Sequence, residues 1–77
     1  MKQAEFIKDI CSLMEIDQNI LQPETNLKGI AEFDSLFIIA LIAYLDEKFR
    51  IKLSAQQINS VSTVKSLMEL IGKENFN

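Results

Sequence analysis

The sequence has no histidine and no tryptophan, and it contains only one cysteine, one proline and two glycines. The single Cys11 excludes an internal disulfide and any site built from several cysteines, and without histidine the common zinc sites are unavailable. A serine nucleophile needs a neighbouring base and an oxyanion hole, and no imidazole exists to act as that base. Since the chain also shows no glycine-rich phosphate loop and no obvious carboxylate pair, we do not expect an enzyme.

Positive charge is also scarce, because eight Lys and Arg residues stand against eleven Asp and Glu, for a net charge of −3. Nucleic-acid binding needs clustered Lys and Arg, so no nucleic acid is expected, and a basic protein surface is the better electrostatic match. The longest apolar run is 36–45, about half of the ~20 residues of a membrane span. No cleavable signal pattern opens the chain. We therefore expect a cytoplasmic protein without a membrane span, and a single domain over residues 1–77.

Apolar residues recur at helical spacing through most of the chain. The pattern predicts four helices, over residues 1–16, 35–49 and 55–60 and from about residue 62 or 63 to Gly72. Asp34 or Ser35 is the expected cap of the second helix, and Ser54 that of the third. Cys11 falls on the apolar face of the first helix and is interpreted as a core residue. The predicted fold is an all-α four-helix bundle with three longer helices, one short helix and a long loop between the first two.

The loop between the first two helices covers about residues 17–33, which contain Pro23 and Gly29 and show no sustained hydrophobic period. We expect its apolar residues to anchor it to the core: Ile20, Leu21, Leu27 and Ile30. A loop of this length in a small domain is usually functional or needs an explanation. Residues 74–77 are expected to fray.

The second helix is apolar on more than one side. On a helical wheel the arc expected to face the core contains Ile38, Leu41, Ile42, Leu45 and Phe49. The opposite arc contains Leu36, Ala40, Ala43 and Glu47, with Phe37 and Tyr44 on one flank and Ile39 and Asp46 on the other. A small bundle can hardly bury a helix on every side, so we expect the outer face to meet a partner. The expected contact residues are Phe33, Leu36, Phe37, Ala40, Ala43, Tyr44 and Glu47.

Other interpretations of this face stay open. Exposed alanines cost nothing, and Leu36 can fold back on the loop, in which case no partner is needed. A second copy of the chain is another possible occupant, although we expect a monomer. An unmodified helical adaptor that binds a protein through this face is the alternative from a different functional class.

Ser35 stands at the start of the second helix, where its hydroxyl is expected to be exposed. A serine in this position is often only a helix cap. A covalent attachment site needs little more than exposure, and a phosphodiester there would lie against unpaired backbone N–H groups and the positive end of the helix dipole.

The motif Asp34-Ser35-Leu36 and the residues behind it resemble the acyl carrier proteins. The matching positions in the second helix are Leu41, Leu45, Asp46, Glu47 and Phe49. Beyond it the resemblance rests on Ile51, Leu53, Ser62-Thr63-Val64, Leu67, Leu70 and Ile71, and before the motif on Thr25 and Leu27. The resemblance covers nearly the whole chain.

The resemblance implies that Ser35 carries 4′-phosphopantetheine, transferred from coenzyme A by a magnesium-dependent phosphopantetheinyl transferase, with Asp34 and Leu36 beside it. The terminal thiol of that arm would hold an acyl group as a thioester for acyl-loading and acyl-transfer or synthase enzymes. The apolar lining for the acyl chain would come from Ile42, Leu45, Phe49, Val61 and Leu67. An aminoacyl or peptidyl carrier, which shares fold and arm, is a close alternative.

The chain departs from the family pattern at two places. Ala31-Glu32-Phe33 precedes the motif where most members have Leu-Gly and a small or apolar residue, which resembles carriers of specialised pathways. Phe37 and Ala40 stand where the family usually has carboxylates. We therefore expect weaker recognition by basic patches and stronger apolar contact with partners.

Overall fold

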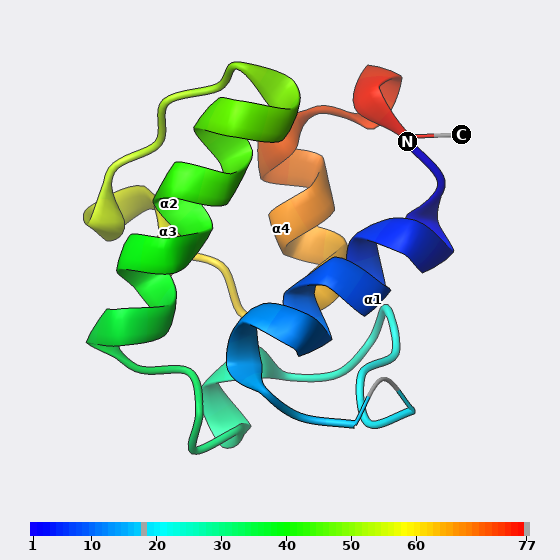
Figure 1. Ribbon diagram of the computed structural model, residues 1–77, viewed down its shortest axis with the longest axis vertical. Coiled ribbons are helices and arrows are strands. Elements are labelled where there is room, and N and C mark those ends of the chain that lie inside the picture. The colour runs from blue at the N-terminus through cyan, green and yellow to red at the C-terminus, as the bar shows by residue number, and fades with distance from the viewer. Residues whose placement is uncertain (18, 77) are drawn as a thin grey trace.

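The computed structural model describes residues 1–17 and 19–76 and is all-helical, as predicted. Its elements in chain order are α1 (Gln3–Met14), η1 (Leu27–Gly29), α2 (Ser35–Phe49), α3 (Ala55–Asn59), α4 (Val64–Ile71) and η2 (Lys73–Asn75). In Figure 1, α2 runs along one side of the molecule, α1 lies opposite it, and the N-terminus lies beside η2 at the upper right. Among the described residues no helix is long and apolar enough to cross a membrane.

The helix boundaries follow from their caps. Helix α1 stops two residues before the predicted end, because Glu15 adopts the left-handed conformation at φ 57° and its N–H donates to the carbonyls of Cys11 and Ser12. Helix α2 has the predicted bounds, and Arg50 ends it at φ 56°. Gly72 ends α4 at φ 118°, a conformation that favours glycine.

The two short helices begin with reciprocal capping boxes. In α3 the Ser54 side chain accepts from the Gln57 N–H, and the Gln57 side chain accepts from the Ser54 N–H. Thr63 and Ser66 make the same exchange at the start of α4. These caps satisfy backbone donors that the first turn of a helix leaves without partners, which helps helices of five and eight residues to form.

The long loop is fastened to the start of α4 by backbone hydrogen bonds. Leu27 N–H donates to the Ser62 carbonyl at 2.7 Å, and Lys65 N–H donates to the Pro23 carbonyl at 2.8 Å. Leu27 and Leu21 are buried in the core, as predicted, and Ile30 packs partly against it. The prediction for Ile20 is wrong, since its side chain is 52% exposed. These bonds and the buried leucines hold the middle of the loop against α4 and the core.

The C-terminal segment is ordered through Phe76, which corrects the prediction of a frayed tail over 74–77; Asn77 lies outside the described residues. The Met1 amine donates to the Asn75 carbonyl at 3.0 Å. The Phe76 ring centroid lies 5.1 Å from that of Phe6 and 5.5 Å from that of Phe49. Phe76 therefore packs against the core, and this aromatic packing holds the tail in place.

Candidate functional site

Ser35 is the first residue of α2 and is exposed. The cap is Asp34: its Oδ1 accepts from the Phe37 N–H at 3.0 Å, and its carbonyl accepts from the Ile38 N–H at 3.0 Å. The sequence left Asp34 and Ser35 as alternative caps, and the structure selects Asp34. The Ser35 hydroxyl is therefore not needed to begin the helix.

The environment of the Ser35 hydroxyl fits a phosphodiester. The first N–H groups of a helix have no partner within it, and here Asp34 takes up only those of Phe37 and Ile38. The N–H groups of Ser35 and Leu36 stay at the positive end of a 15-residue helix. A phosphate esterified to Ser35 would meet these donors and the helix dipole.

An apolar hollow of about 430 Å³ lies on one side of Ser35, between the start of α2 and α3. Its lining residues are Phe33, Asp34, Ser35, Ile38, Ile39, Ala55 and Asn59. Apart from Asp34, the lining carries no charge. A group attached to Ser35 therefore has apolar surface within reach on this side.

An acidic hollow of about 240 Å³ lies on the other side, between the end of α1 and the start of α2. Its lining residues are Leu13, Met14, Glu15, Glu32, Asp34, Leu36 and Phe37. Within residues 1–17 and 19–76 no group of three or more His, Cys, Asp or Glu side chains is arranged to hold a metal ion. Ser35 thus stands at the border between an apolar surface and an acidic one.

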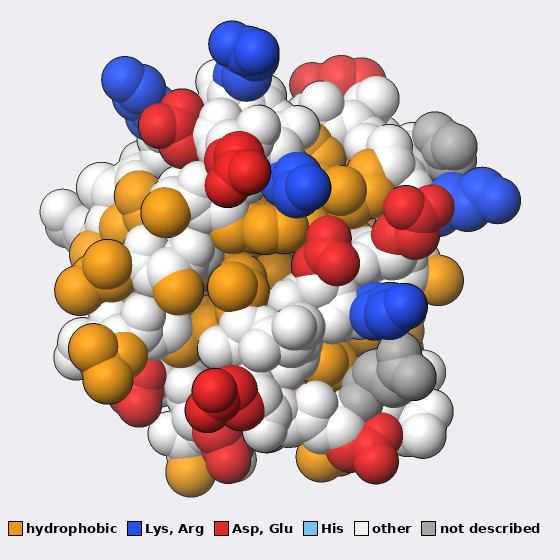
Figure 2. All heavy atoms as spheres, in the orientation of Figure 1, with side chains coloured by type: hydrophobic (Ala, Val, Ile, Leu, Met, Phe, Trp, Pro, Cys, Tyr) orange, Lys and Arg blue, Asp and Glu red, His pale blue; other side chains and the backbone are white. Residues whose placement is uncertain are grey.

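The outer face of α2 is apolar near Ser35. The Leu36 side chain is 79% exposed and that of Ile39 is 65% exposed. Ala43 and Glu47 are exposed farther along, and Ala40 is half-buried. Figure 2 shows hydrophobic side chains gathered on the left of the molecule, where α2 and α3 lie in Figure 1.

The structure corrects the predicted contact face at Phe37 and Tyr44. Phe37 is only 3% exposed and belongs to the core. Tyr44 is half-buried, and its hydroxyl donates to Asp9 Oδ2 of α1 at 2.7 Å. Burial, followed by this carboxylate, raises the pKa of Tyr44. Both side chains are turned away from the outer face because α1 packs against that flank of α2.

Ile39 is the exposed residue that the contact list missed. It follows Phe37 by two positions, about 200° around the helix, so an inward Phe37 requires an outward Ile39. The helical wheel placed Ile39 on a flank of the helix. The sequence of a helix that is apolar on several sides does not show which of these sides faces the core. Phe33 was also expected on the contact face. Its ring is half-buried and packs on Phe37, with the ring centroids 5.7 Å apart, so it is only partly available to a partner.

The residues expected to line an acyl chain lie together in the core. Leu45 and Leu67 are fully buried, Val61 is 6% exposed, and Ile42 and Phe49 pack partly against the same cluster. Cys11 is also buried there, as predicted, and burial raises the pKa of its thiol. A buried thiol of raised pKa is a poor nucleophile, so Cys11 acts as a core residue.

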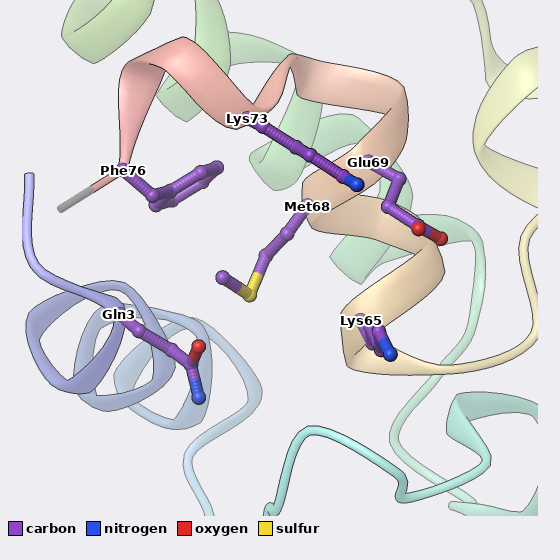
Figure 3. Close-up of a pocket in the computed structure, with 6 residues that line it drawn as sticks. All are labelled: Gln3, Lys65, Met68, Glu69, Lys73 and Phe76. Carbon is purple, nitrogen blue, oxygen red and sulfur yellow. The ribbon is translucent and has the colours of Figure 1, made fainter.

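A third hollow, of about 260 Å³, lies between α1, α4 and η2 (Figure 3). Met68 and Phe76 point into it, Lys65 and Glu69 line its α4 side, and Gln3 of α1 and Lys73 of η2 complete the lining. It shares no lining residue with the hollows beside Ser35, and no serine or cysteine lines it. It is therefore not part of the site around Ser35.

Comparison with known proteins relates the chain to phosphopantetheine carriers. The model of the family described as "Phosphopantetheine attachment site" matches residues 4–71. A protein named acyl carrier protein from Syntrophobacter fumaroxidans is 27% identical over 71 residues, covering 92% of this chain and 88% of the relative. One from Phytoplasma mali is 31% identical over 70 residues, with coverages of 91% and 80%. One from Helicobacter hepaticus is 29% identical over 58 residues, with coverages of 75% and 76%. No solved structure gives a significant match.

Proposed function

This chain belongs to the acyl carrier protein family, and from that premise we propose that Ser35 carries its covalent 4′-phosphopantetheine. Members of this family are carriers and not catalysts. The observation that supports Ser35 is its place as an exposed first residue of α2, with the cap supplied by its neighbour Asp34. The hydroxyl is thereby presented on a rigid helix end that a transferase can approach.

The chain's own residues position the arm. Asp34 fixes the first turn of α2, which sets the direction of the Ser35 side chain. The N–H groups of Ser35 and Leu36 offer donors to the phosphate, and the apolar hollow toward Ala55 offers a surface to an apolar cargo. When bound, the arm supplies a thiol that holds the cargo as a thioester.

We further propose that the carrier serves a dedicated acyl pathway, in which acyl-loading and acyl-transfer or synthase enzymes use it. Two features support this assignment. Glu32 and Phe33 precede the motif, as in carriers of specialised pathways, and Phe33 lines the hollow beside Ser35. Phe37 and Ala40 stand where the family usually has carboxylates, and Leu36 and Ile39 expose apolar surface beside the attachment residue.

Intact-protein mass spectrometry tests the attachment. The chain is incubated with coenzyme A, magnesium and a phosphopantetheinyl transferase, and we expect a mass gain of one phosphopantetheine group. Ser35→Ala should abolish the gain, whereas Ser12→Ala, which removes another exposed helical serine, should leave it intact. A gain that persists in Ser35→Ala, or no gain in the wild-type chain, would overturn the proposal.

Loading experiments test the cargo class. The modified protein is incubated with acyl donors and their activating enzymes and, separately, with aminoacyl donors and theirs. We expect thioester formation with the acyl set. Preferential aminoacyl loading would assign the chain to the aminoacyl or peptidyl carriers instead.

A further inference from the structure

We propose that the hollow between α1, α4 and η2 is a second binding site, which takes a small amphiphilic anion: a carboxylate on a short alkyl chain. The ligand is held there without a covalent bond. The hollow shares no lining residue with those beside Ser35, so the inference goes beyond the proposed attachment and does not depend on it.

The floor of the hollow is apolar. Met68 of α4 and Phe76 point into it, and both side chains are only half-buried, so part of their apolar surface stays open (Figure 3). The volume of about 260 Å³ lies just below the ~300–1,000 Å³ of pockets for drug-sized ligands. It therefore suits one short alkyl chain. A methionine side chain is flexible and polarisable, which lets it adapt to such a chain.

The rim of the hollow is positively charged. Lys65 and Lys73 line it together with a single carboxylate, Glu69, which can offset the charge of only one of them. Lys65 and Glu69 are four positions apart on α4, and in Figure 3 the Lys73 side chain runs from η2 toward Glu69. Gln3 of α1 adds an uncharged amide donor. A carboxylate head group would therefore meet ammonium and amide donors above an apolar floor.

The hollows beside Ser35 are poor sites for the same ligand. Glu15, Glu32 and Asp34 line the acidic hollow, and Asp34 is the charged residue of the apolar one. Like charge repels a carboxylate from both. The chain as a whole is acidic, with a net charge of −3, yet two of its eight cationic side chains line the hollow between α1, α4 and η2. An anion is therefore drawn to this hollow and away from Ser35.

Methyl NMR on ¹³C-labelled methionine tests the site in the unmodified chain. The chain has three methionines, of which Met68 lines the proposed site and Met14 lines the acidic hollow beside Ser35. Octanoate at about 20 mM NaCl, where exposed charges are weakly screened, should shift the Met68 signal and leave that of Met14 in place. A dissociation constant of about 1–10 mM is expected for a ligand of this size. Acetate, which lacks the chain, and octylammonium, which reverses the charge, should not shift the Met68 signal.

Charge variants test the rim. The double variant Lys65→Gln/Lys73→Gln should weaken octanoate binding about fivefold, and Glu69→Gln should tighten it about threefold, because it removes the carboxylate that competes with the ligand. Damage to the fold cannot imitate tighter binding. The matched control is Lys8→Gln, which alters the lysine of a neighbouring hollow along α1 and should leave the dissociation constant unchanged.

Four results would overturn the inference. The first is the absence of a saturable Met68 shift with octanoate, and the second is an equal response to acetate or octylammonium. The third is a shift of Met14 in place of Met68, or weaker binding in Lys8→Gln, since either places the ligand in another hollow. The fourth is a Met68 signal that moves on dilution of the protein alone, which would assign the hollow to a second copy of the chain. None of these results depends on Ser35, so failure here leaves the proposed attachment untouched.

Discussion

The Tyr44 hydroxyl of α2 donates a hydrogen bond to Asp9 Oδ2 of α1 at 2.7 Å. The two residues are 35 positions apart in the sequence, so the bond joins α1 to α2. Tyr44 and Phe37 lie on the flank of α2 that packs on α1, and Ile39 faces outward. The bond is therefore part of the contact between α1 and α2 that accompanies this orientation of α2.

We expect Tyr44→Phe to lower the free energy of unfolding by about 1 kcal/mol, because a partly buried carboxylate loses its donor. Urea unfolding followed by circular dichroism measures this. Asp9→Asn and the double variant complete a mutant cycle. If the two single losses simply add, the hydrogen bond contributes nothing to stability.

The burial of the Tyr44 phenol, together with this bond, predicts a loss of stability in alkali. The pKa of Tyr44 is raised in the folded protein, so the folded state holds the phenol proton more tightly than the unfolded chain does. The stabilisation is therefore complete below the unfolded pKa of ~10 and falls as the pH rises above it. The stability advantage of the wild-type chain over Tyr44→Phe should shrink across this range. Because Tyr44 is the single tyrosine, phenolate absorbance reports its titration directly, and titration at the ordinary value in the folded protein would contradict the expectation.

Asp34 can be tested as a cap separately from any role in recognition. Asp34→Ala should cost about 1 kcal/mol of stability through loss of the bond to the Phe37 N–H, whereas Asp34→Asn should keep most of it. Thermal unfolding of both variants measures the difference. Equal losses in the two variants would show that the charge, and not the cap, stabilises the helix. If the transferase KM rises for Asp34→Asn although this variant keeps its stability, the transferase recognises the carboxylate itself.

Phe37 and Leu36 are adjacent in the sequence but should respond in opposite ways to truncation. Phe37→Ala removes a core ring and should cost about 3 kcal/mol or more. Leu36→Ala removes an exposed side chain and should cost less than about 0.5 kcal/mol. Chemical unfolding of the two variants decides the matter, and similar losses would contradict the orientation of α2.

The C-terminal aromatic cluster gives a further stability test. Phe76→Ala should cost about 1.5 kcal/mol, since its ring packs against those of Phe6 and Phe49. Lys73→Ala, an exposed change in η2, serves as the control and should be close to neutral. A neutral Phe76→Ala would restore the interpretation of residues 74–76 as a frayed end. Differential scanning calorimetry is sufficient for both variants.

Local features were predictable because they depend on neighbours in the sequence. The bounds of α2, the Ser54 cap of α3 and the stop at Gly72 all follow from short-range hydrogen bonding and backbone conformation. The buried place of Cys11 followed from the period of α1. From the sequence, either Asp34 or Ser35 could cap α2. Only the hydrogen bond from the Phe37 N–H to the Asp34 side chain identifies Asp34 as the cap.

Features that depend on contacts between distant segments were not predictable in the same way. The order of the tail requires Phe6 and Phe49 to meet Phe76, and the fastening of the loop requires Pro23 to face Lys65 of α4. Hydrophobic periodicity records that a residue is apolar but not which element will cover it. Ile20 was expected to anchor the loop in the core but is exposed, and Phe76 was expected in a frayed tail but packs against the core.

The sequence by itself determined where α2 starts and that Asp34-Ser35-Leu36 stands there, because a helix start depends on neighbouring residues. Only the tertiary structure decided which side of α2 meets solvent. An almost uniformly apolar helix has no strong preference of its own, so the packing of α1 on Phe37 and Tyr44 sets its rotation. That rotation leaves Leu36 and Ile39 exposed beside Ser35.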